Sequence, residues 1–391
     1  MIPDSYSPVP DSTPVAPQPL VPPSAPPSVP KAPVFPPPPG GFGNQQTNNP
    51  AMFSRPAGDF MENILAAARV EPVTFSQIND IGDELVEEAP PVAECPIAPR
   101  ELPVGTLLHG YRVQRCIGGG GFGVTYLAQE SMLNRTVVIK ENFPDSLCYR
   151  EEGTLDVRLH NPETGTDGYN WALNNFLREV RLLATLDHPC IAKVYSYFEE
   201  HGTAYYVVEY INGISLDKLA AQHAAMGRPI PQSSLFGLMV RLLDALDYLH
   251  GLNLLHRDIK PDNILITRAG LPVIIDFGAA REAYGDITNN IVESPGFSPS
   301  EQSTSDGNMG PWTDIYALGA TLYYTLTGTC LPPGKQRLIY DTADPLSTNK
   351  ELLRTYHPVL LASIDRAISP QPERRYQSVA EWMHALASTH L

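Results

Sequence analysis

The 391-residue sequence has few cysteines, few basic side chains and no long apolar run. No stretch of about 18 uncharged apolar residues occurs, so we expect no integral membrane span. Residues 1–30 lack the basic start and apolar region of a secretory signal peptide, which argues against that export route. The five cysteines are odd in number and have no C-x-x-C spacing, so we expect reduced thiols in a cytoplasmic protein, without a disulfide framework or a zinc site. They are Cys95, Cys116, Cys148, Cys190 and Cys330.

Positive charge is scarce as well, because 27 Lys and Arg residues stand against 43 Asp and Glu residues, for a net charge of -16. Proteins that hold nucleic acid neutralise its phosphates with clustered Lys and Arg. The acidic balance therefore argues against a nucleic-acid partner, and equally against a polybasic membrane-surface protein.

Proline is unevenly distributed, with 23 of the 40 prolines in residues 1–100. The same hundred residues carry four basic and eleven acidic side chains. Such a segment cannot bury enough apolar surface to offset the entropy that its backbone would lose on ordering. We therefore expect a disordered proline-rich segment over 1–58, an acidic linker over 59–104 with a short helix at 59–70, and one folded unit of about 280 residues.

The proline-rich segment 1–58 favours extended polyproline II, most clearly in the four-proline run 36–39. One interpretation is a ligand for a proline-recognising partner. The other is a semi-rigid spacer, which the lack of a distinct recognition core favours.

From about residue 105 the sequence changes to short β-like runs and then to longer helical periodicities. A β-rich first part followed by an α-rich second part predicts an α+β fold of two lobes with a cleft between them. We place the N-lobe at about 105–209 and the C-lobe at about 212–389. The expected strands are 111–117, 124–129, 136–140, 191–198 and 204–209, and the clearest expected helices are 168–186, 235–249 and 314–327.

A glycine-rich G-x-G-x-x-G motif occurs at Gly118, Gly120 and Gly123. Glycines let a backbone approach phosphates closely and present its N–H groups to them. A dinucleotide-binding fold would require a helix directly after the motif. The residues 124–128 continue as a strand instead, which favours a β-hairpin covering nucleotide phosphates. A plain glycine-rich turn is the alternative for this motif taken alone.

Lys140 stands in the apolar strand pattern 136–140. A buried lysine is costly unless it is paired. One interpretation is a phosphate-binding lysine whose ion-pair partner is Glu179, on the helical pattern 168–186. The alternative is a strand-end lysine whose ammonium group reaches solvent.

The most specific signal is the run H-R-D-I-K-P-D-N, followed at a short distance by D-F-G. Within it, Asp258 is suited to accept a hydroxyl proton, and Lys260 to neutralise a transferring phosphoryl group. Asn263 and Asp276 supply oxygen ligands for Mg²⁺. Together these groups form a complete set for phosphoryl transfer.

These motifs resemble the eukaryotic-type (Hanks) serine/threonine protein kinases, and in their details the bacterial members, over about 109–388. The resemblance implies the bilobal protein-kinase fold, with helix αC in a β-rich N-lobe and a helical C-lobe. It implies transfer of the ATP γ-phosphoryl group to Ser or Thr hydroxyls of protein substrates, with Mg²⁺, or Mn²⁺ in its place. The implied catalytic residues are Asp258, as the base, and Lys260, and the implied metal ligands are Asn263 and Asp276. The implied nucleotide-binding residues are Ile117, Gly118, Gly120, Gly123, Thr125, Val138, Lys140, Glu179, Glu209, Ile211 and Leu265.

The resemblance also implies structural roles in both lobes. It places Val208 at the gatekeeper position and Asp314 where an aspartate of helix αF anchors the catalytic loop. Glu301 and Arg375 are implied to form a buried ion pair in the C-lobe. The residues of the stacked spine would be Leu183, Val194, His256 and Phe277.

Two hydroxyl residues bear on the substrate and on regulation. Ser294 replaces the usual Thr ahead of a Pro-Gly-Phe segment and is expected to contact Asp258 directly. Arg257, next to that aspartate, invites an anionic partner on the activation segment. Thr288 is our candidate for autophosphorylation.

The sequence departs from the family in a few places. Val138 stands where Ala is common, and Thr125 where Val is common. The stretch 141–178 is an insertion, and turn signals occur at 142–146 and 161–165. We weigh two interpretations of this insertion, a contact for a substrate or regulator and a tolerated surface segment.

Other classes of function stay open beside an active kinase. They are a pseudokinase scaffold, an adaptor acting through the proline-rich tail, and a small-molecule kinase. The intact set of Lys140, Asp258, Asn263 and Asp276 favours the active protein kinase. We expect a cytoplasmic location in a bacterium and leave delivery into a host cell open.

Overall fold

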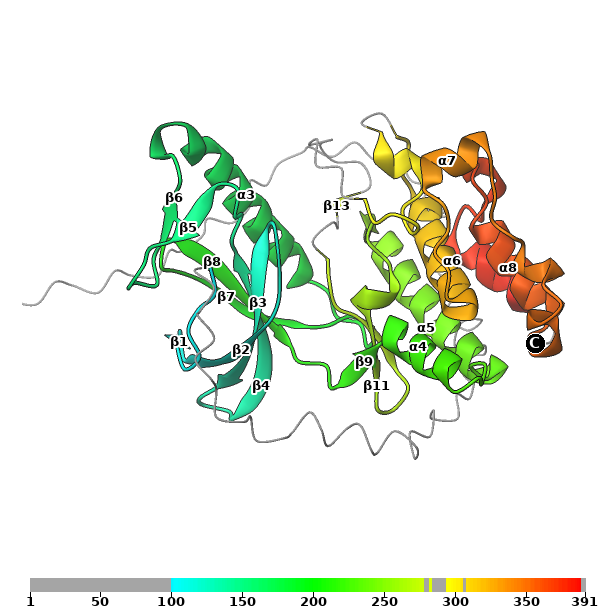
Figure 1. Cartoon of the computed structure of the whole chain (residues 1–391), viewed down its shortest axis with the longest axis horizontal. Helices are drawn as coiled ribbons and strands as arrows, with labels where there is room; N and C mark the ends of the chain where they lie inside the picture. Colours follow the sequence, from blue (N-terminus) through cyan, green and yellow to red (C-terminus); the bar gives the residue numbers. More distant parts are fainter. Residues whose placement is uncertain (1–99, 278–280, 283–292, 305–306, 388–391) are drawn as a thin grey trace, which may run out of the picture. The chain divides into compact units, whose positions relative to one another are not determined.

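The computed structural model describes residues 100–277, 281–282, 293–304 and 307–387, all within one compact unit of the chain (Figure 1). The expected proline-rich segment 1–58 and the expected helix 59–70 lie outside the described residues. Thr288 lies outside them as well. Within the described part, no helix combines the length and the apolar character needed to cross a membrane.

The first lobe is built on an antiparallel sheet with the strand order β1-β2-β3-β4-β8-β7. Side chains of β3 alternate between the two faces of this sheet, so that Val124, Tyr126 and Ala128 are buried in its apolar core. The five expected strands are thereby confirmed, apart from shifts at their ends. The strands are β1 (Leu107–Leu108), β2 (Tyr111–Gly120), β3 (Gly123–Glu130), β4 (Arg135–Asn142), β7 (Val194–Glu200) and β8 (Thr203–Glu209).

Helix α3 (Pro162–Leu183) packs against this sheet and begins six residues before the expected helix 168–186. The side chain of Asn161 caps it by accepting hydrogen bonds from the backbone N–H groups of Glu163 and Thr164, at 3.1 and 3.4 Å. Pro162 occupies the first helical turn, where no N–H group is needed. The turn expected at 161–165 is therefore wrong, because the same residue types also start a helix.

The insertion forms a small hairpin of β5 (Cys148–Arg150) and β6 (Val157–Leu159) ahead of α3 (Figure 1). It is tied to the sheet, since the N–H of Val157 donates to the carbonyl of His201 at 2.8 Å. The lobe also includes residues that the sequence assigns to the linker 59–104. Leu102 is buried in its core, and its N–H donates to the Tyr126 hydroxyl at 3.1 Å.

The second lobe is mainly helical and has its own large apolar core. A three-stranded sheet, in the order β12-β11-β9, and the pair β10-β13 lie at its start. The expected helices 235–249 and 314–327 are confirmed with small extensions. The helices are α4 (Leu216–Ala225), α5 (Gln232–Gly251), α6 (Pro311–Thr327), α7 (Gly334–Ile339), α8 (Pro358–Ala367) and α9 (Val379–Ala387). The strands are β9 (Gly213–Ser215), β10 (Leu254–Leu255), β11 (Ile264–Thr267), β12 (Pro272–Ile274) and β13 (Arg281–Glu282). Short 3₁₀ helices are η2 (Pro261–Asn263), η3 (Ser300–Ser303), η4 (Leu346–Thr348), η5 (Leu352–Arg354) and η6 (Pro372–Arg374).

The two lobes are joined by backbone hydrogen bonds and by a third apolar cluster. The carbonyl of Ile274 accepts from the N–H of Ala192 at 3.0 Å, and its N–H donates to the carbonyl of Cys190 at 2.8 Å. The cluster combines Val208 of β8 with Val273 of β12. This junction lies beside the segments that carry the expected catalytic motifs.

Candidate active site

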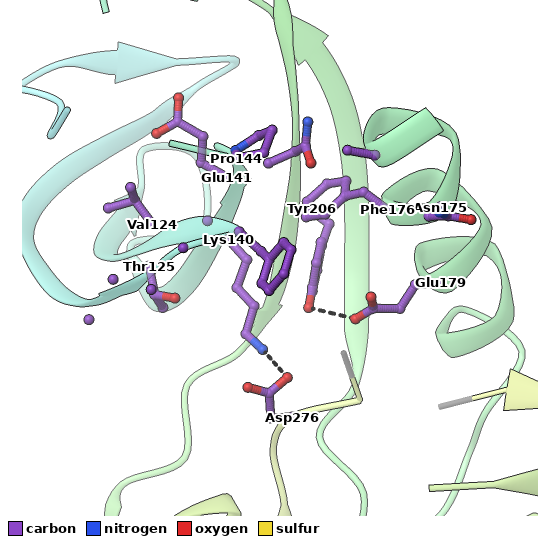
Figure 2. A pocket seen from close by; sticks show the side chains of 18 of the residues that line it. Val124, Thr125, Lys140, Glu141, Pro144, Asn175, Phe176, Glu179, Tyr206 and Asp276 are labelled. Atoms are coloured by element: carbon purple, nitrogen blue, oxygen red, sulfur yellow. Dashed lines mark hydrogen bonds and ion pairs between the residues drawn. The ribbon is translucent and has the colours of Figure 1, made fainter. Parts of the chain in front are cut away.

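A cavity of about 450 Å³ lies between the glycine-rich loop, β4, helix α3 and the C-lobe residues Asp258 and Asp276 (Figure 2). The expected site residues that line it are Gly118, Gly120, Gly123, Thr125, Lys140, Glu179, Asp258 and Asp276. The remaining expected residues lie outside this lining, namely Ile117, Val138, Glu209, Ile211, Lys260, Asn263 and Leu265.

Three of the outlying residues meet beside the cavity in the apolar cluster at the lobe junction. Val138 of β4, Ile211 and Leu265 of β11 pack there with Val208, the expected gatekeeper. These side chains come from both lobes and offer flat apolar contact, which suits an aromatic ring.

Ile117 and Glu209, two other expected nucleotide contacts, belong neither to the cavity lining nor to this apolar cluster. Ile117 of β2 is exposed. The N–H of Glu209 is used in a hydrogen bond to the carbonyl of Lys193, at 2.8 Å. Their contact with adenine stays a prediction.

The glycine-rich loop is the turn of the β2–β3 hairpin, where Gly120 pairs with Gly123. A Cβ atom on Gly123 would lie 2.5 Å from the carbonyl oxygen of Glu141, so this position requires glycine. A Cβ atom on Gly118 or Gly120 would meet nothing within 4 Å. Close strand packing therefore explains the glycine at position 123. The glycines at 118 and 120 leave open space beside the cavity.

Lys140 projects from β4 toward the C-lobe, and its Nζ pairs with Asp276 Oδ1 at 2.8 Å (Figure 2). Burial disfavours the ammonium charge, but Tyr206 and the carboxylates of Asp276 and Glu179 outweigh it and raise the pKa of Lys140. The lysine is therefore a fixed cation in the cavity. The expected direct pairing of Lys140 with Glu179 stays a prediction.

Tyr206 is a cavity residue that the motifs do not reveal. It lies opposite Lys140 in the β4–β8 register, and its hydroxyl donates to Glu179 Oε1 at 3.5 Å (Figure 2). Its ring centroid lies 5.8 Å from Lys140 Nζ. Only the strand register could have located it, because a lone tyrosine in a strand has no sequence signature of function.

Asp258 lies in the segment 256–263, the expected catalytic loop, and is surrounded by donors. Lys260 Nζ contacts its Oδ1 at 3.2 Å and its Oδ2 at 2.9 Å. The Asn263 amide nitrogen donates to Oδ2 at 2.8 Å and to the Asp258 carbonyl at 2.9 Å. These bonds fix the carboxylate in one orientation.

Ser294 presents a hydroxyl directly to this group. Its Oγ donates to Asp258 Oδ1 at 2.6 Å and accepts from Lys260 Nζ at 3.1 Å. The expected contact of Ser294 with Asp258 is confirmed. The site can therefore hold an aliphatic hydroxyl between a carboxylate and an ammonium group.

Asp314 anchors the catalytic loop from the N-terminus of α6, as expected. The fully buried carboxylate accepts from the backbone N–H groups of His256 and Arg257, at 2.9 and 2.8 Å, and from the His250 ring at 2.9 Å. Burial alone would raise its pKa, but the His250 hydrogen bond and the nearby imidazoles lower the pKa of Asp314. Arg257 has a φ of 67°, a left-handed conformation that these bonds hold in place.

The expected ion pair of the C-lobe is also present. Arg375 Nη1 contacts Glu301 Oε1 at 2.6 Å, and both side chains are buried. The rings of His256 and Phe277, two of the four expected spine residues, lie with their centroids 4.5 Å apart and their planes tilted by 56°.

Asn263 and Asp276 are compatible with Mg²⁺ in their chemistry. The N–H of Ile275 donates to the Asn263 carbonyl at 3.0 Å, which brings the two candidate ligands to the same end of the β11–β12 hairpin. Since the amide nitrogen of Asn263 bonds to Asp258, its amide oxygen is the atom left for a cation. Among the described residues no cluster of three or more His, Cys, Asp and Glu forms a complete protein cage. One carboxylate and one amide suit Mg²⁺, which takes its other ligands from phosphates and water.

Comparisons with known proteins agree with this geometry. A family model described as "Protein kinase domain" matches residues 111–383. Among curated proteins, the serine/threonine-protein kinase PknA of Nostoc sp. is 33% identical over 293 residues, which are 71% of this chain and 46% of that protein. The serine/threonine-protein kinase PrkC of Bacillus subtilis is 29% identical, over 72% of this chain and 41% of that protein. The chain thus spans about half the length of the curated relatives it matches.

Two solved structures are similar as well. The apo form of PpkA-294 is 38% identical, with a TM-score of 0.64, and the match covers 73% of this chain and 99% of that one. The kinase domain of Mycobacterium tuberculosis PknI is 23% identical, with a TM-score of 0.53 over 74% of this chain, which bears on the fold alone.

Proposed function

This chain belongs to the protein kinase family, and we propose that it transfers the γ-phosphoryl group of ATP to Ser and Thr hydroxyls of proteins. The observation that carries the proposal is the Ser294 hydroxyl, which donates to Asp258 at 2.6 Å while Lys260 contacts both groups. A phosphoryl acceptor needs the same surroundings, a carboxylate for its proton and a cation nearby.

We assign the chemistry to a few residues of the chain. Asp258 orients the acceptor hydroxyl and takes its proton. Lys260 neutralises charge on the transferring group, and Lys140 holds the nucleotide phosphates. The metal ion would be held by Asn263 and Asp276, and it supplies charge neutralisation at the phosphates. Positioning and electrostatics carry most of the rate in such reactions.

The decisive experiment measures phosphorylation of protein Ser and Thr by labelled ATP with Mg²⁺. We expect wild type to be active, and Asp258→Asn to lose about 10²–10⁴ in rate while keeping nucleotide affinity, because it lacks only the base. Lys140→Met should lose affinity for the nucleotide as well. Retained Mg²⁺-ATP binding with no transfer by wild type would contradict the proposal and favour a pseudokinase scaffold.

Two finer points belong to the same proposal. We infer that the enzyme phosphorylates itself, with Thr288 as the first candidate, and phosphopeptide mapping after incubation with Mg²⁺-ATP tests this. Residues 1–58 are the candidate ligand for a proline-recognising partner, and an isolated peptide of these residues tests that binding separately.

A further inference from the structure

Arg100 reaches the backbone of the glycine-rich loop from outside the cavity. Its Nη2 donates to the carbonyl oxygen of Gly120 at 2.7 Å and to that of Gly123 at 3.2 Å. The two carbonyls belong to Gly120 and Gly123, the paired residues on either side of the hairpin turn. One guanidinium group thus holds both sides of the loop.

The two residues between them are held by the insertion. The N–H of Asp145 donates to the carbonyl of Gly121 at 3.2 Å, and the N–H of Phe143 donates to the carbonyl of Phe122 at 3.0 Å. All four successive carbonyls from 120 to 123 therefore accept hydrogen bonds from outside the loop.

The backbone N–H groups at the tip of the loop, unlike the carbonyls, have no hydrogen-bond partner among the described residues. The backbone N–H groups of Gly121 and Phe122 donate to no acceptor within the described part of the chain. Peptide groups whose carbonyls are engaged and whose N–H groups are available form an anion-binding concavity. The loop is therefore arranged to receive phosphate oxygens before any nucleotide arrives.

Arg100 is itself fixed by the strand that carries Lys140. Its carbonyl accepts from Arg150 at 3.2 and 3.0 Å, and Arg150 pairs with the buried Glu141, the residue after Lys140, at 2.7 Å. Asp145 contacts the other end of the guanidinium at 3.4 Å. The phosphate-binding lysine and the glycine-rich loop are thus joined through Arg100.

We propose that Arg100 is a positioning residue for the nucleotide, which holds the glycine-rich loop with its N–H groups available to the ATP phosphates. The proposal rests on the proposed function. Arg100 acts through the carbonyls of the loop and makes no contact with ATP, so its replacement raises the entropy of the empty loop and the cost of ordering it around phosphates.

A direct attraction between the Arg100 charge and the phosphates is the competing explanation, and two variants separate it from positioning. Arg100→Lys keeps the charge but loses the planar guanidinium, whose Nη2 donates to both carbonyls while its Nη1 contacts Asp145. Asp145→Asn removes a negative charge near the loop, which would strengthen ATP binding if charge alone mattered. If positioning matters, the same change weakens binding, because the ion pair that helps to hold the guanidinium is lost.

The experiment measures KM for ATP and kcat in the full chain, together with hydrogen exchange of the Phe143 amide without nucleotide, since that amide donates to the loop carbonyl of Phe122. We expect Arg100→Gln and Arg100→Lys to raise KM for ATP about three- to tenfold, with kcat within about twofold. Asp145→Asn should raise KM about twofold. The Phe143 amide should exchange faster in all three variants, because a loosened loop holds its acceptor less firmly. Arg112→Gln is the matched control. That exposed arginine lies at the end of β2 away from the loop and donates to the Gly105 carbonyl, so its replacement should change neither quantity.

Three results would overturn the proposal. They are an unchanged KM in Arg100→Gln, a KM that Arg100→Lys restores to the wild-type value, and a lower KM in Asp145→Asn. Failure of the proposed function is a separate result, an inactive wild-type chain. In that case equal exchange rates of the Phe143 amide in wild type and Arg100→Gln would also overturn the proposal.

Discussion

At the scale of single residues, two glycines of the same loop, Gly123 and Gly118, differ in the space around them. A methyl group on Gly123 would press on the Glu141 carbonyl 2.5 Å away, whereas one on Gly118 meets nothing within 4 Å. We predict that Gly123→Ala lowers the free energy of unfolding by about 1–3 kcal/mol. Gly118→Ala should leave stability unchanged and weaken ATP binding. Urea unfolding and ATP titration of both variants check this, and equal stability losses would contradict it.

The buried His256 should make the free energy of unfolding depend on pH, and its burial sets the sign of that dependence. Burial lowers its pKa below the ordinary value of 6.5, against the opposing charges of Asp314 and Asp258. As the pH falls through 6.5, this histidine is protonated in the unfolded chain before it is protonated in the folded one. The free energy of unfolding therefore decreases as the pH falls. We predict that the free energy of unfolding decreases from pH 7.5 to pH 5.5, and decreases less in His256→Phe. An identical decrease in both proteins would contradict this assignment.

Contacts made within short motifs could be predicted from the sequence. They include the contact of Ser294 with Asp258 and the bonds of Asp314 to the loop that carries Asp258. Tyr206 and Arg100 could not be predicted, since their roles come from a strand register and from a contact across 20 or more residues. Sequence motifs report functional groups, and they report less about the residues that hold those groups.

At the scale of elements, the insertion is tied to the sheet by one buried ion pair. Arg150 of β5 contacts Glu141 of β4 at 2.7 Å with almost no exposure of either side chain, whereas Arg158 of β6 pairs with Glu151 and is 54% exposed. Loss of one partner from a buried pair leaves an uncompensated charge, and loss of an exposed pair costs little.

We therefore predict that Arg150→Met lowers the free energy of unfolding by about 3–5 kcal/mol. Arg158→Met, in the same hairpin, should change it by less than about 1 kcal/mol. Denaturant unfolding of the two variants measures both values. Similar small losses in both variants would contradict the structural role assigned to the buried pair.

The start of α3 shows why element boundaries were harder to predict than element types. The sequence Asn161-Pro162 was interpreted as a turn because both residues favour one. The same pair caps a helix when amphipathic residues follow, and Tyr169, Leu177 and Val180 bury one face of α3. The choice between turn and cap depends on whether a surface is present to bury that face, which lies outside the local sequence.

At the scale of the whole domain, the cavity draws its charged groups from both lobes. Lys140 comes from the sheet lobe and Asp276 from the helical lobe, and their 2.8 Å contact crosses between separate apolar cores. The two-lobe organisation could be predicted from the change in periodicity. The partner of Lys140 could not, because it depends on how closely the lobes approach.

Binding of Mg²⁺-ATP between the lobes should stabilise the whole domain. A ligand at 100 times its Kd adds about 2.7 kcal/mol to the free energy of unfolding, and each kcal/mol raises the Tm of a domain this large by about 2–4 °C. We predict an increase in Tm of several degrees with Mg²⁺-ATP, and a much smaller one with ATP and a chelator.

The increase should largely disappear in Lys140→Met, which loses the phosphate cation, and in Asp276→Asn, which loses the metal carboxylate. It should persist in the surface control Arg158→Met. Thermal unfolding followed by fluorescence measures all of these. An increase that needs no Mg²⁺ would contradict the assignment of Asp276 as a metal ligand, because the ion is what links that carboxylate to the phosphates.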